Sequence, residues 1–277
     1  TNEYWRNMKI IAELCQNHNG DINTLKDMVV KSAESGADIV KIQSIKANSL
    51  TKRDEFESFR KYSDEYKRLA SLELSMDDEL EFIHTAKANN VIPMTTIFSP
   101  NHYEYYNSLG YDYLKLSGYS MRAFDWGKKL DKFNFKHLVF STSSLHLHDI
   151  QKCIDNLKGV DFTILHCVCL YPTPFEKLNL QSIEHLKTLH DKVGFSDHSD
   201  NLLPSKLAIF QGIDMLEKHF TILDKEETRD GKVSVTPDEL QELHKFSNYT
   251  KDGQYLALNG FNKEQRFNHE YYQGRFE

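Results

Sequence analysis

Short hydrophobic segments alternate with amphipathic ones along most of this 277-residue chain, and this alternation limits the possible folds more than any other feature. Each amphipathic segment repeats apolar residues near positions i, i+3, i+4 and i+7, which is the pattern of a helix packed on a sheet. The pattern predicts eight strands, at 9–15, 38–43, 91–98, 112–117, 137–142, 162–168, 192–196 and 214–220. It predicts helices at 24–36, 76–90, 102–110, 122–133, 147–159, 180–190, 204–212 and 237–249.

Successive strand–helix units predict an α/β fold with parallel strands, because parallel strands need crossover helices between them. About 240 residues in eight such units is the size of a (β/α)8 TIM barrel. A doubly wound open sheet is the alternative, but it usually has fewer strands and a glycine-rich first turn, whereas the first turn here reads QNHNGD. We therefore expect a TIM-barrel domain over residues 1–249 and a short C-terminal extension, 250–277, that forms no separate domain.

One segment interrupts the alternation. Residues 44–75 are longer than an ordinary strand-to-helix loop and contain a charged, amphipathic stretch. In a barrel this loop would lie beside the catalytic end, so it could form a lid or a wall of the substrate site. A solvated surface helix is the other interpretation.

Composition and charge argue against several classes of protein. The chain carries 41 acidic and 34 basic residues, a net charge of −7, without a basic run that would neutralise nucleic-acid phosphates. Apolar stretches fall short of the roughly 20 residues that span a bilayer, and TNEYWRNMKI lacks the apolar core of a signal peptide. The four cysteines are too scattered for a disulfide scaffold, and we interpret Cys167 and Cys169 as small core residues. We expect a cytoplasmic protein without nucleic-acid or membrane partners.

In a TIM barrel, functional side chains lie at the carboxyl ends of the strands and in the loops that follow. Lys41, Lys115 and Lys218 lie at such positions on three strands, where a buried ammonium group is costly unless an anion pairs with it. Converging lysines would suit a phosphate or carboxylate group of a small substrate. The alternative is that they form ion pairs with Glu13 and Glu217 inside the barrel. Other polar residues at the expected strand ends are Asn17, Gln43, Thr96, Ser117, Ser141, His166 and Tyr171.

Two histidines follow neighbouring strands, His198 in GFSDHS and His219 in LEKHFT. Imidazoles from adjacent strands can approach one divalent cation, and an oxygen or thiolate ligand would leave open positions for water and substrate. Asp230, in the loop after the last strand, could add a carboxylate directly or through a bound water. His198 and His219 are therefore the candidate metal ligands.

Several longer strings resemble the sialic acid synthase family, whose members condense phosphoenolpyruvate with an N-acetylated amino sugar. These strings are IAELCQNHNGD, GADIVKIQ, LHCVCLYPTPFEKLNL, GFSDHS and EKHFTILDK, and the resemblance covers residues 8–245 in order. It implies a metal held by His198 and His219, usually Mn²⁺, with Mg²⁺ or Co²⁺ as alternatives. It also implies a homodimer that acts on phosphoenolpyruvate and a sugar.

The resemblance further implies roles for individual residues. Lys41, Thr96, Lys115 and the Ser141 region match positions that hold phosphoenolpyruvate, and Tyr171 and Asp230 match residues near the acceptor sugar. Taken with the strand-end positions, the expected catalytic residues are Lys41, Lys115, Tyr171 and Asp230. The expected substrate-binding residues are Asn17, Gln43, Thr96, Ser117, Ser141, His166 and Lys218.

Two other functions fit the same residues. A metal-dependent aldolase that uses pyruvate would need the same residues with fewer phosphate ligands. A barrel that binds a sugar without catalysis is the third possibility, although rim charges without partners would have no purpose in it. Release of phosphate during turnover separates the first function from the other two.

The C-terminal extension is the last feature. In the sialic acid synthases, an antifreeze-like domain follows the barrel and reaches the partner's site, and residues 250–277 are too few to form it. The extension is rich in aromatic residues, so we expect it to pack on its own barrel or on a neighbouring chain. One hypothesis is that Arg266 or Arg275 reaches an active site across a dimer. The other is that the extension covers helix surface far from the site.

Overall fold

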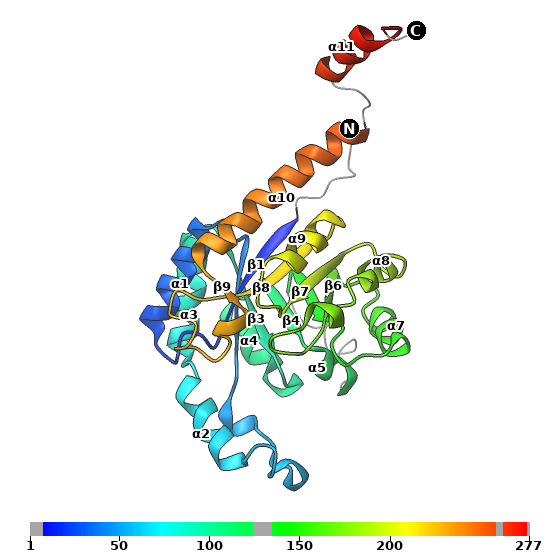
Figure 1. Cartoon of the computed structure of the whole chain (residues 1–277). Helices are drawn as coiled ribbons and strands as arrows, with labels where there is room; N and C mark the ends of the chain where they lie inside the picture. Colours follow the sequence, from blue (N-terminus) through cyan, green and yellow to red (C-terminus); the bar gives the residue numbers. More distant parts are fainter. Residues whose placement is uncertain (1–7, 124–134, 259–262, 276–277) are drawn as a thin grey trace.

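The computed structural model describes residues 8–123, 135–258 and 263–275. Its centre is a closed barrel of eight parallel strands, in which each strand pairs with the next and the eighth pairs with the first (Figure 1). The strands are β1 (Lys9–Cys15), β2 (Ile39–Gln43), β3 (Ile92–Ile97), β4 (Tyr113–Leu116), β5 (His137–Ser141), β6 (Phe162–Cys167), β7 (Val193–Asp197) and β8 (Met215–Phe220). The TIM barrel is confirmed, and the open sheet is wrong, because β1 and β8 form a parallel ladder.

The sequence pattern missed one strand. A two-residue strand, β9 (Ser234–Val235), pairs with the end of β8. Two residues are too few to show an alternation of apolar and polar side chains, so hydrophobic periodicity cannot reveal such a strand.

Helices surround the barrel where the apolar periodicity predicted them, on the outside of the strands (Figure 1). The expected helix at 122–133 lies mostly outside the described residues. The α-helices of the barrel are α1 (Ile22–Glu34), α3 (Met76–Ala88), α4 (Tyr103–Leu109), α5 (Gly118–Ala123), α7 (Leu147–Asn156), α8 (Gln181–Lys187), α9 (Leu203–Phe210) and α10 (Pro237–Leu258). Short 3-10 helices form at Pro100–His102 (η3), Phe175–Lys177 (η4) and Gly231–Val233 (η5).

The barrel interior explains how the strands present polar side chains. A layer of apolar residues fills its lower part, from Ile11, Ile39, Met94, Val139, Leu165 and Met215. Successive side chains of a strand point to opposite faces, so the residue two positions further along each strand points into the same interior. That step leads from the apolar layer to Glu13, Lys41, Thr96, Ser141, Cys167 and Glu217. The interior thus changes from apolar to polar toward the carboxyl ends of the strands.

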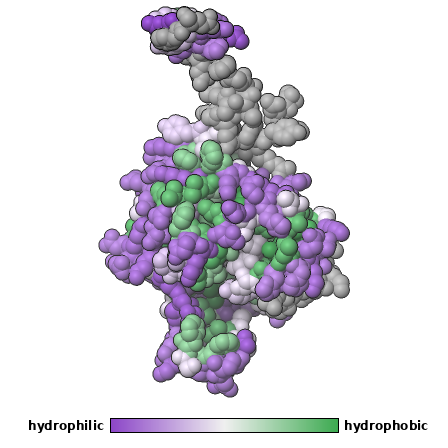
Figure 2. All heavy atoms as spheres, turned by 45° about the vertical axis from the view of Figure 1, so that its right-hand side comes forward, coloured by the Kyte–Doolittle hydropathy of each residue, from purple (hydrophilic) through white to green (hydrophobic). Residues whose placement is uncertain are grey.

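The insertion at 44–75 folds into η1 (Ala47–Ser49), η2 (Asp54–Phe56) and α2 (Tyr62–Leu72). It projects from one end of the barrel, at the bottom of Figure 1. Phe56 and Phe59 are 48% and 80% exposed, and Figure 2 shows apolar atoms on the surface of this projection. Exposed aromatic side chains are not typical of a helix whose surface only contacts solvent, so they argue against the interpretation of this insertion as a solvated surface helix.

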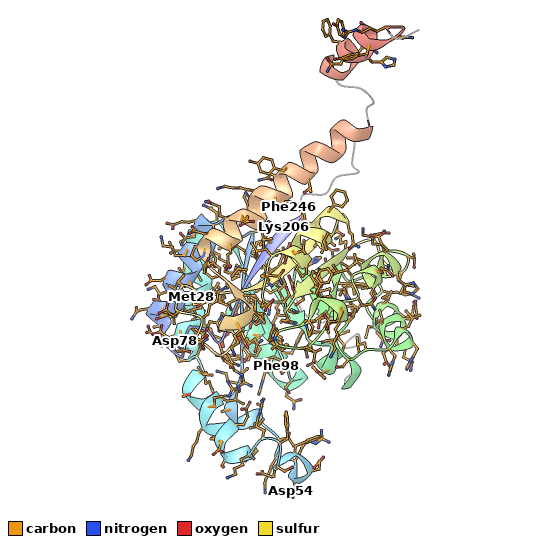
Figure 3. All side chains as sticks on the ribbon, in the orientation of Figure 1. Met28, Asp54, Asp78, Phe98, Lys206 and Phe246 are labelled. Carbon is orange, nitrogen blue, oxygen red and sulfur yellow. The ribbon has the colours of Figure 1, made fainter. Side chains whose placement is uncertain are left out.

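In the C-terminal part, α10 runs without a break from Pro237 to Leu258, across the expected boundary between 249 and 250. Leu240 and Leu243 of α10 are buried, and Phe246 lies beside Lys206 of α9, whose ammonium group is 5.7 Å from the ring centre (Figure 3). The next helix, α11 (Lys263–Tyr272), leaves residues 266–275 exposed. The extension therefore does not cover the barrel at these residues, and its contact with a neighbouring chain stays a prediction.

No helix in the described part of the chain combines the length and the apolar character that a membrane crossing requires.

Candidate active site at the carboxyl end of the barrel

Two of the three expected lysines form ion pairs inside the barrel. The ammonium group of Lys41 pairs with Glu13 and lies 3.6 Å from Glu217, and Lys115 pairs with the other oxygen of Glu217. Lys41 also donates a hydrogen bond of 2.7 Å to the hydroxyl oxygen of Thr96. The ion pairs with Glu13 and Glu217 that were the alternative interpretation are therefore present, and binding of a substrate anion by these lysines stays a prediction.

Burial and neighbouring charges shift the protonation equilibria of this network. Burial lowers the pKa of Lys41 to about 7, against the opposing effect of Glu217. Burial acts to raise the pKa of Glu217, but the ammonium groups of Lys115 and Lys41 outweigh it and hold this pKa below its usual value. An anion that approached Lys41 would favour the protonated ammonium, so the network is suited to a charged ligand.

Lys218 and His166 lie on the opposite face of their strands from this network. Lys218 forms an ion pair of 3.1 Å with Asp197 and donates a hydrogen bond of 2.7 Å to the carbonyl of Ser199. His166 donates a hydrogen bond of 2.7 Å to the carbonyl of Leu178. The expectation that Lys218 converges with the other lysines is wrong, because it stands one position away from Glu217 and therefore points outward.

This placement predicts a structural effect for Lys218. Lys218→Ala should lower the free energy of unfolding by about 3–5 kcal/mol, because it leaves the carboxylate of Asp197 buried without its cation. Lys206→Ala is the matched control, since Lys206 pairs with Glu242 at the surface and should cost less than about 1 kcal/mol. Urea unfolding curves measure both values. Equal stability of the two variants would contradict the structural role.

The two candidate metal ligands lie together, as expected, with ring centres 5.3 Å apart. His198 donates from Nδ1 to the carbonyl of Val168 over 3.0 Å, which leaves its Nε2 as an acceptor 3.1 Å from the hydroxyl of Tyr171. His219 is buried, and its Nδ1 has no hydrogen-bond partner among the described residues. Burial lowers the pKa of both imidazoles, so both are neutral near pH 7 and their lone pairs are available to a metal.

A carboxylate and a thiol complete this group. Asp230 Oδ2 lies 3.8 Å from His219 Nδ1 and accepts a hydrogen bond of 3.1 Å from the thiol of Cys15. One ligand atom each from Cys15, His219 and Asp230 lies within 4.8 Å of the others. Imidazole, carboxylate and thiol groups at this spacing fit a divalent first-row metal ion. Sequence reasoning missed Cys15, although its position at the carboxyl end of the first strand was a signal for it.

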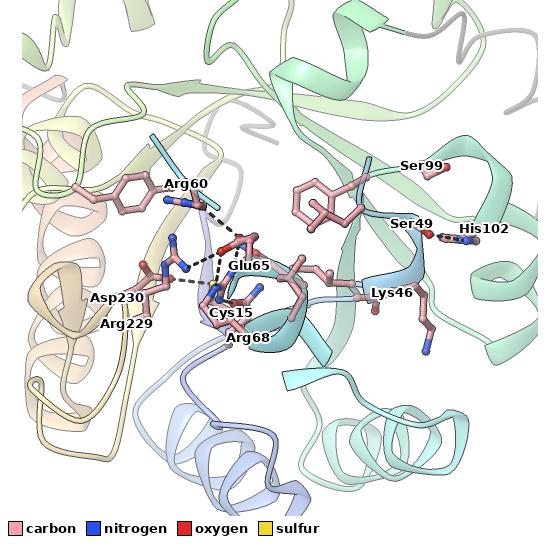
Figure 4. Close-up of a pocket in the computed structure, with 18 residues that line it drawn as sticks. Cys15, Lys46, Ser49, Arg60, Glu65, Arg68, Ser99, His102, Arg229 and Asp230 are labelled. Atoms are coloured by element: carbon pink, nitrogen blue, oxygen red, sulfur yellow. Dashed lines mark hydrogen bonds and ion pairs between the residues drawn. The ribbon is translucent and has the colours of Figure 1, made fainter. Parts of the chain in front are cut away.

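A cavity of about 630 Å³ opens above these residues. Cys15, Gln43, Tyr171 and Asp230 line it, and so do residues of the insertion. The insertion is therefore a wall of the cavity, as one of the two interpretations of its sequence proposed (Figure 4).

Three arginines surround one carboxylate in this wall, as Figure 4 shows. Glu65 lies 2.7 Å from Arg68, 3.3 Å from Arg60 and 4.0 Å from Arg229. Arg68 also donates to the side-chain oxygen of Gln16 over 2.8 Å. Glu65 balances only one of the three positive charges. Sequence reasoning missed this group, because no local pattern relates residue 229 to residues 60–68.

Three other expected site residues hold loops in place. Asn17 is fully buried and donates hydrogen bonds to the carbonyl of Phe220 (2.9 Å) and the hydroxyl of Ser234 (3.0 Å). Ser141 accepts from the backbone N–H of Gly118 (3.2 Å). Ser117 likewise accepts from the backbone N–H of Ser120 (3.2 Å). Ser117 and Ser141 thus fix the start of α5 beside the carboxyl end of β5, while Asn17 fixes the first loop against β8 and β9.

Comparison with known protein families shows to which family this chain belongs. The model of the NeuB family matches residues 28–252. The chain belongs to the NeuB family. This finding confirms the resemblance to the sialic acid synthases.

Relatives of this NeuB-family chain carry related names. It is 33% identical to an N,N'-diacetyllegionaminic acid synthase of Campylobacter jejuni, over 84% of this chain and 73% of the relative. It is 32% identical to a protein of the same name from Legionella pneumophila, over 84% and 69%. It is 27% identical to an N-acetylneuraminate-9-phosphate synthase of Drosophila melanogaster, over 84% and 65%.

Solved structures share the fold of this NeuB-family chain. The crystal structure of an N-acetylneuraminic acid synthetase from Leptospira borgpetersenii superposes with a TM-score of 0.82 at 22% identity, covering 98% of this chain and 93% of the other. The spore coat polysaccharide biosynthesis protein SpsE of Bacillus subtilis gives a TM-score of 0.76 at 25% identity, covering 93% and 72%.

Proposed function

We propose that this chain catalyses the metal-dependent condensation of phosphoenolpyruvate with an aldose, an amino sugar or a related sugar. The products would be a 2-keto-3-deoxy sugar acid and phosphate, as in the synthesis of sialic-acid-like sugars. One observation carries the proposal: the Lys41–Lys115 network and the group of His219, Asp230 and Cys15 lie at the same end of one barrel, and Cys15 and Asp230 line a cavity there.

The interior network would hold the donor. Lys115 is the more exposed lysine of the two, at 7%, whereas Lys41 is 1% exposed. A phosphate or carboxylate of phosphoenolpyruvate would compete with Glu217 for Lys115, while Lys41 and Thr96 stay behind it. Ser141, on the same interior face, would add a hydroxyl donor.

His198, His219 and Asp230 would hold the metal ion. The orphaned Nδ1 of His219 and the neutral state of both imidazoles support this assignment. Mn²⁺ is the ion we propose, with Mg²⁺ or Co²⁺ as alternatives, and its chemical contribution is Lewis-acid polarisation of the acceptor's aldehyde. The hydrogen bond from His198 to Val168 leaves the lone pair on Nε2 of His198, where the hydroxyl of Tyr171 now donates over 3.1 Å and a metal ion would take its place. The ring of Tyr171 lies against both imidazoles.

The proposed reaction forms one carbon–carbon bond and releases phosphate. C3 of the enol phosphate forms a bond to the aldehyde carbon, water adds at C2, and phosphate leaves with its bridging oxygen. The residues of the barrel would hold both reactants in attack geometry, which would convert a bimolecular step into one within the complex. Loss of phosphate makes the reaction irreversible in practice.

The insertion would bind the acceptor. Arg68 lines the cavity and is tied to Glu65 and Gln16, so it presents a fixed guanidinium group to a sugar. We predict that Arg68→Met raises KM for the acceptor about tenfold or more and leaves KM for phosphoenolpyruvate within about twofold. Arg53→Met is the control, because Arg53 is exposed on the same insertion and pairs with Glu55 instead. Steady-state kinetics with each substrate varied in turn measure both constants, and equal changes in the two would contradict this role.

The proposed function has a direct assay. Phosphate release from phosphoenolpyruvate with Mn²⁺ is measured across N-acetylmannosamine, its 6-phosphate, diacetamido hexoses, and plain hexoses and pentoses. We expect sugar-dependent release with at least one amino sugar. Turnover with pyruvate at an equal rate would favour the aldolase. Sugar binding without any turnover would favour the non-catalytic barrel, which the paired interior lysines no longer argue against.

A further inference from the structure

Cys15 stands in an unusual backbone conformation at the end of β1. Its φ is 50°, in the left-handed region that residues with a side chain seldom adopt. The pairing of β1 with β2 shifts register between Glu13 and Cys15, which is the mark of a bulge. Bulges beside active sites commonly turn a side chain in a new direction. Here the thiol points to Asp230 and lines the cavity.

The thiol is part of a compact group of ligand atoms from three distant segments. Its sulfur is 3.1 Å from Asp230 Oδ2, which in turn is 3.8 Å from His219 Nδ1. One ligand atom from each residue lies within 4.8 Å of the other two, close to the span of the ligands around a single metal ion.

A second observation points to a missing ligand at the same place. Nδ1 of His219 belongs to a side chain only 3% exposed, and it has no hydrogen-bond partner in the described part of the chain. A buried polar atom without a partner is costly, so native structures usually supply one. The nearby carboxylate is too far away to accept a hydrogen bond, whereas an ion between the three residues would satisfy the nitrogen.

We propose that the thiolate of Cys15 is a ligand of the same divalent ion that His219 and Asp230 hold, with His198, directly after β7, as the fourth residue. The centre is then a mixed sulfur, oxygen and nitrogen site. A thiolate ligand favours Zn²⁺, Co²⁺ and Fe²⁺ over Mg²⁺, which prefers oxygen ligands alone. This inference rests on the metal site of the proposed function and adds a ligand that tunes the choice of ion.

Cobalt is the probe that detects the thiolate directly. The protein with all 277 residues of this chain is stripped of metal with a chelator and titrated with Co²⁺, and the near-ultraviolet absorption is recorded. A sulfur-to-cobalt charge-transfer band is expected in the native protein. Cys15→Ser should abolish the band and weaken Co²⁺ binding about 100-fold, because even indirect changes around a metal cost 10–100-fold.

Two cysteine variants are matched controls. Cys167→Ser tests the thiol that lies 3.8 Å from His198 Nδ1, and Cys153→Ser tests a buried thiol of α7. Both should keep the band. Absence of the band in the native protein, or its survival in Cys15→Ser, would overturn the proposal, as would its loss in Cys167→Ser alone.

A measurement on the unmodified protein guards against a variant that fails to fold. X-ray absorption of the Zn²⁺-loaded protein should show one sulfur scatterer at about 2.3 Å from the metal. A shell of nitrogen and oxygen alone would overturn the proposal. These spectra do not depend on turnover, so a band without phosphate release would reject the proposed reaction and leave the thiolate assignment standing.

Discussion

Replacing His198 or His219 with alanine should reduce kcat/KM at least about 1,000-fold, which corresponds to about 4 kcal/mol of lost transition-state stabilisation. The imidazole rings of His198 and His219 have centres 5.3 Å apart, and His219 lies beside Asp230. If one imidazole is removed, only one histidine ligand remains among the residues that we assign to the metal. The loss should appear in phosphate release, and the metal content of each purified variant should fall in parallel.

These variants should stay folded, which separates lost chemistry from lost structure. His219 makes no hydrogen bond through Nδ1, so its removal leaves no new unpaired donor or acceptor at that atom. His84→Ala is the control, because His84 is exposed on α3, which packs outside the barrel. Activity that survives both substitutions and treatment with a chelator would reject the metal assignment.

Lys115→Ala is expected to lower kcat/KM for phosphoenolpyruvate by about 100- to 1,000-fold. The substitution would remove the charge-assisted contact that we propose between Lys115 and the donor dianion, and one such contact is worth about 2.7–4 kcal/mol in a site shielded from water. KM for the donor should rise and kcat should fall, because the charge acts both in binding and in the transition state. Steady-state kinetics with phosphoenolpyruvate varied at saturating sugar measure the two effects.

Lys115 is a cleaner test of the donor site than Lys41. After its removal, Glu217 keeps the hydroxyl of Ser196 at 2.7 Å and the ammonium group of Lys41 at 3.6 Å, so the carboxylate is not left alone. Lys136→Ala is the control, because Lys136 is exposed and pairs with Asp112 at the surface. If the Lys115 variant used phosphoenolpyruvate as well as the native chain does, the proposed donor site would be wrong.

The periodicity of the chain was enough to predict the barrel. Runs such as 9–15 and 214–220 alternate with helical patterns, and all eight predicted strands match the observed ones to within two residues. The period of two along each strand also predicts which side chains point into the barrel. From Ile11 to Glu13, or from Met215 to Glu217, a step of two residues stays inside the barrel. Applied to Lys218, that rule would have placed it outside.

The residues around the metal position were predicted in part. His198 follows β7, His219 lies near the end of β8 and Asp230 follows β8, so their proximity could be inferred from the order of the strands. Cys15 was missed because its direction depends on a bulge and a left-handed backbone at the end of β1. Neither feature changes the pattern of apolar residues.

What the sequence by itself determined is therefore the type, order and inward face of the strands, because these follow from local periodicity. Only the tertiary structure decided which charges meet. Closure of the barrel brings Lys115 to Glu217, 102 positions away, and the loop after β8 brings Asp230 to Cys15, 215 positions away. The folding of the insertion sets Arg68 and Arg229 around Glu65. Such contacts depend on distances across the barrel, and local patterns along one chain do not encode these distances.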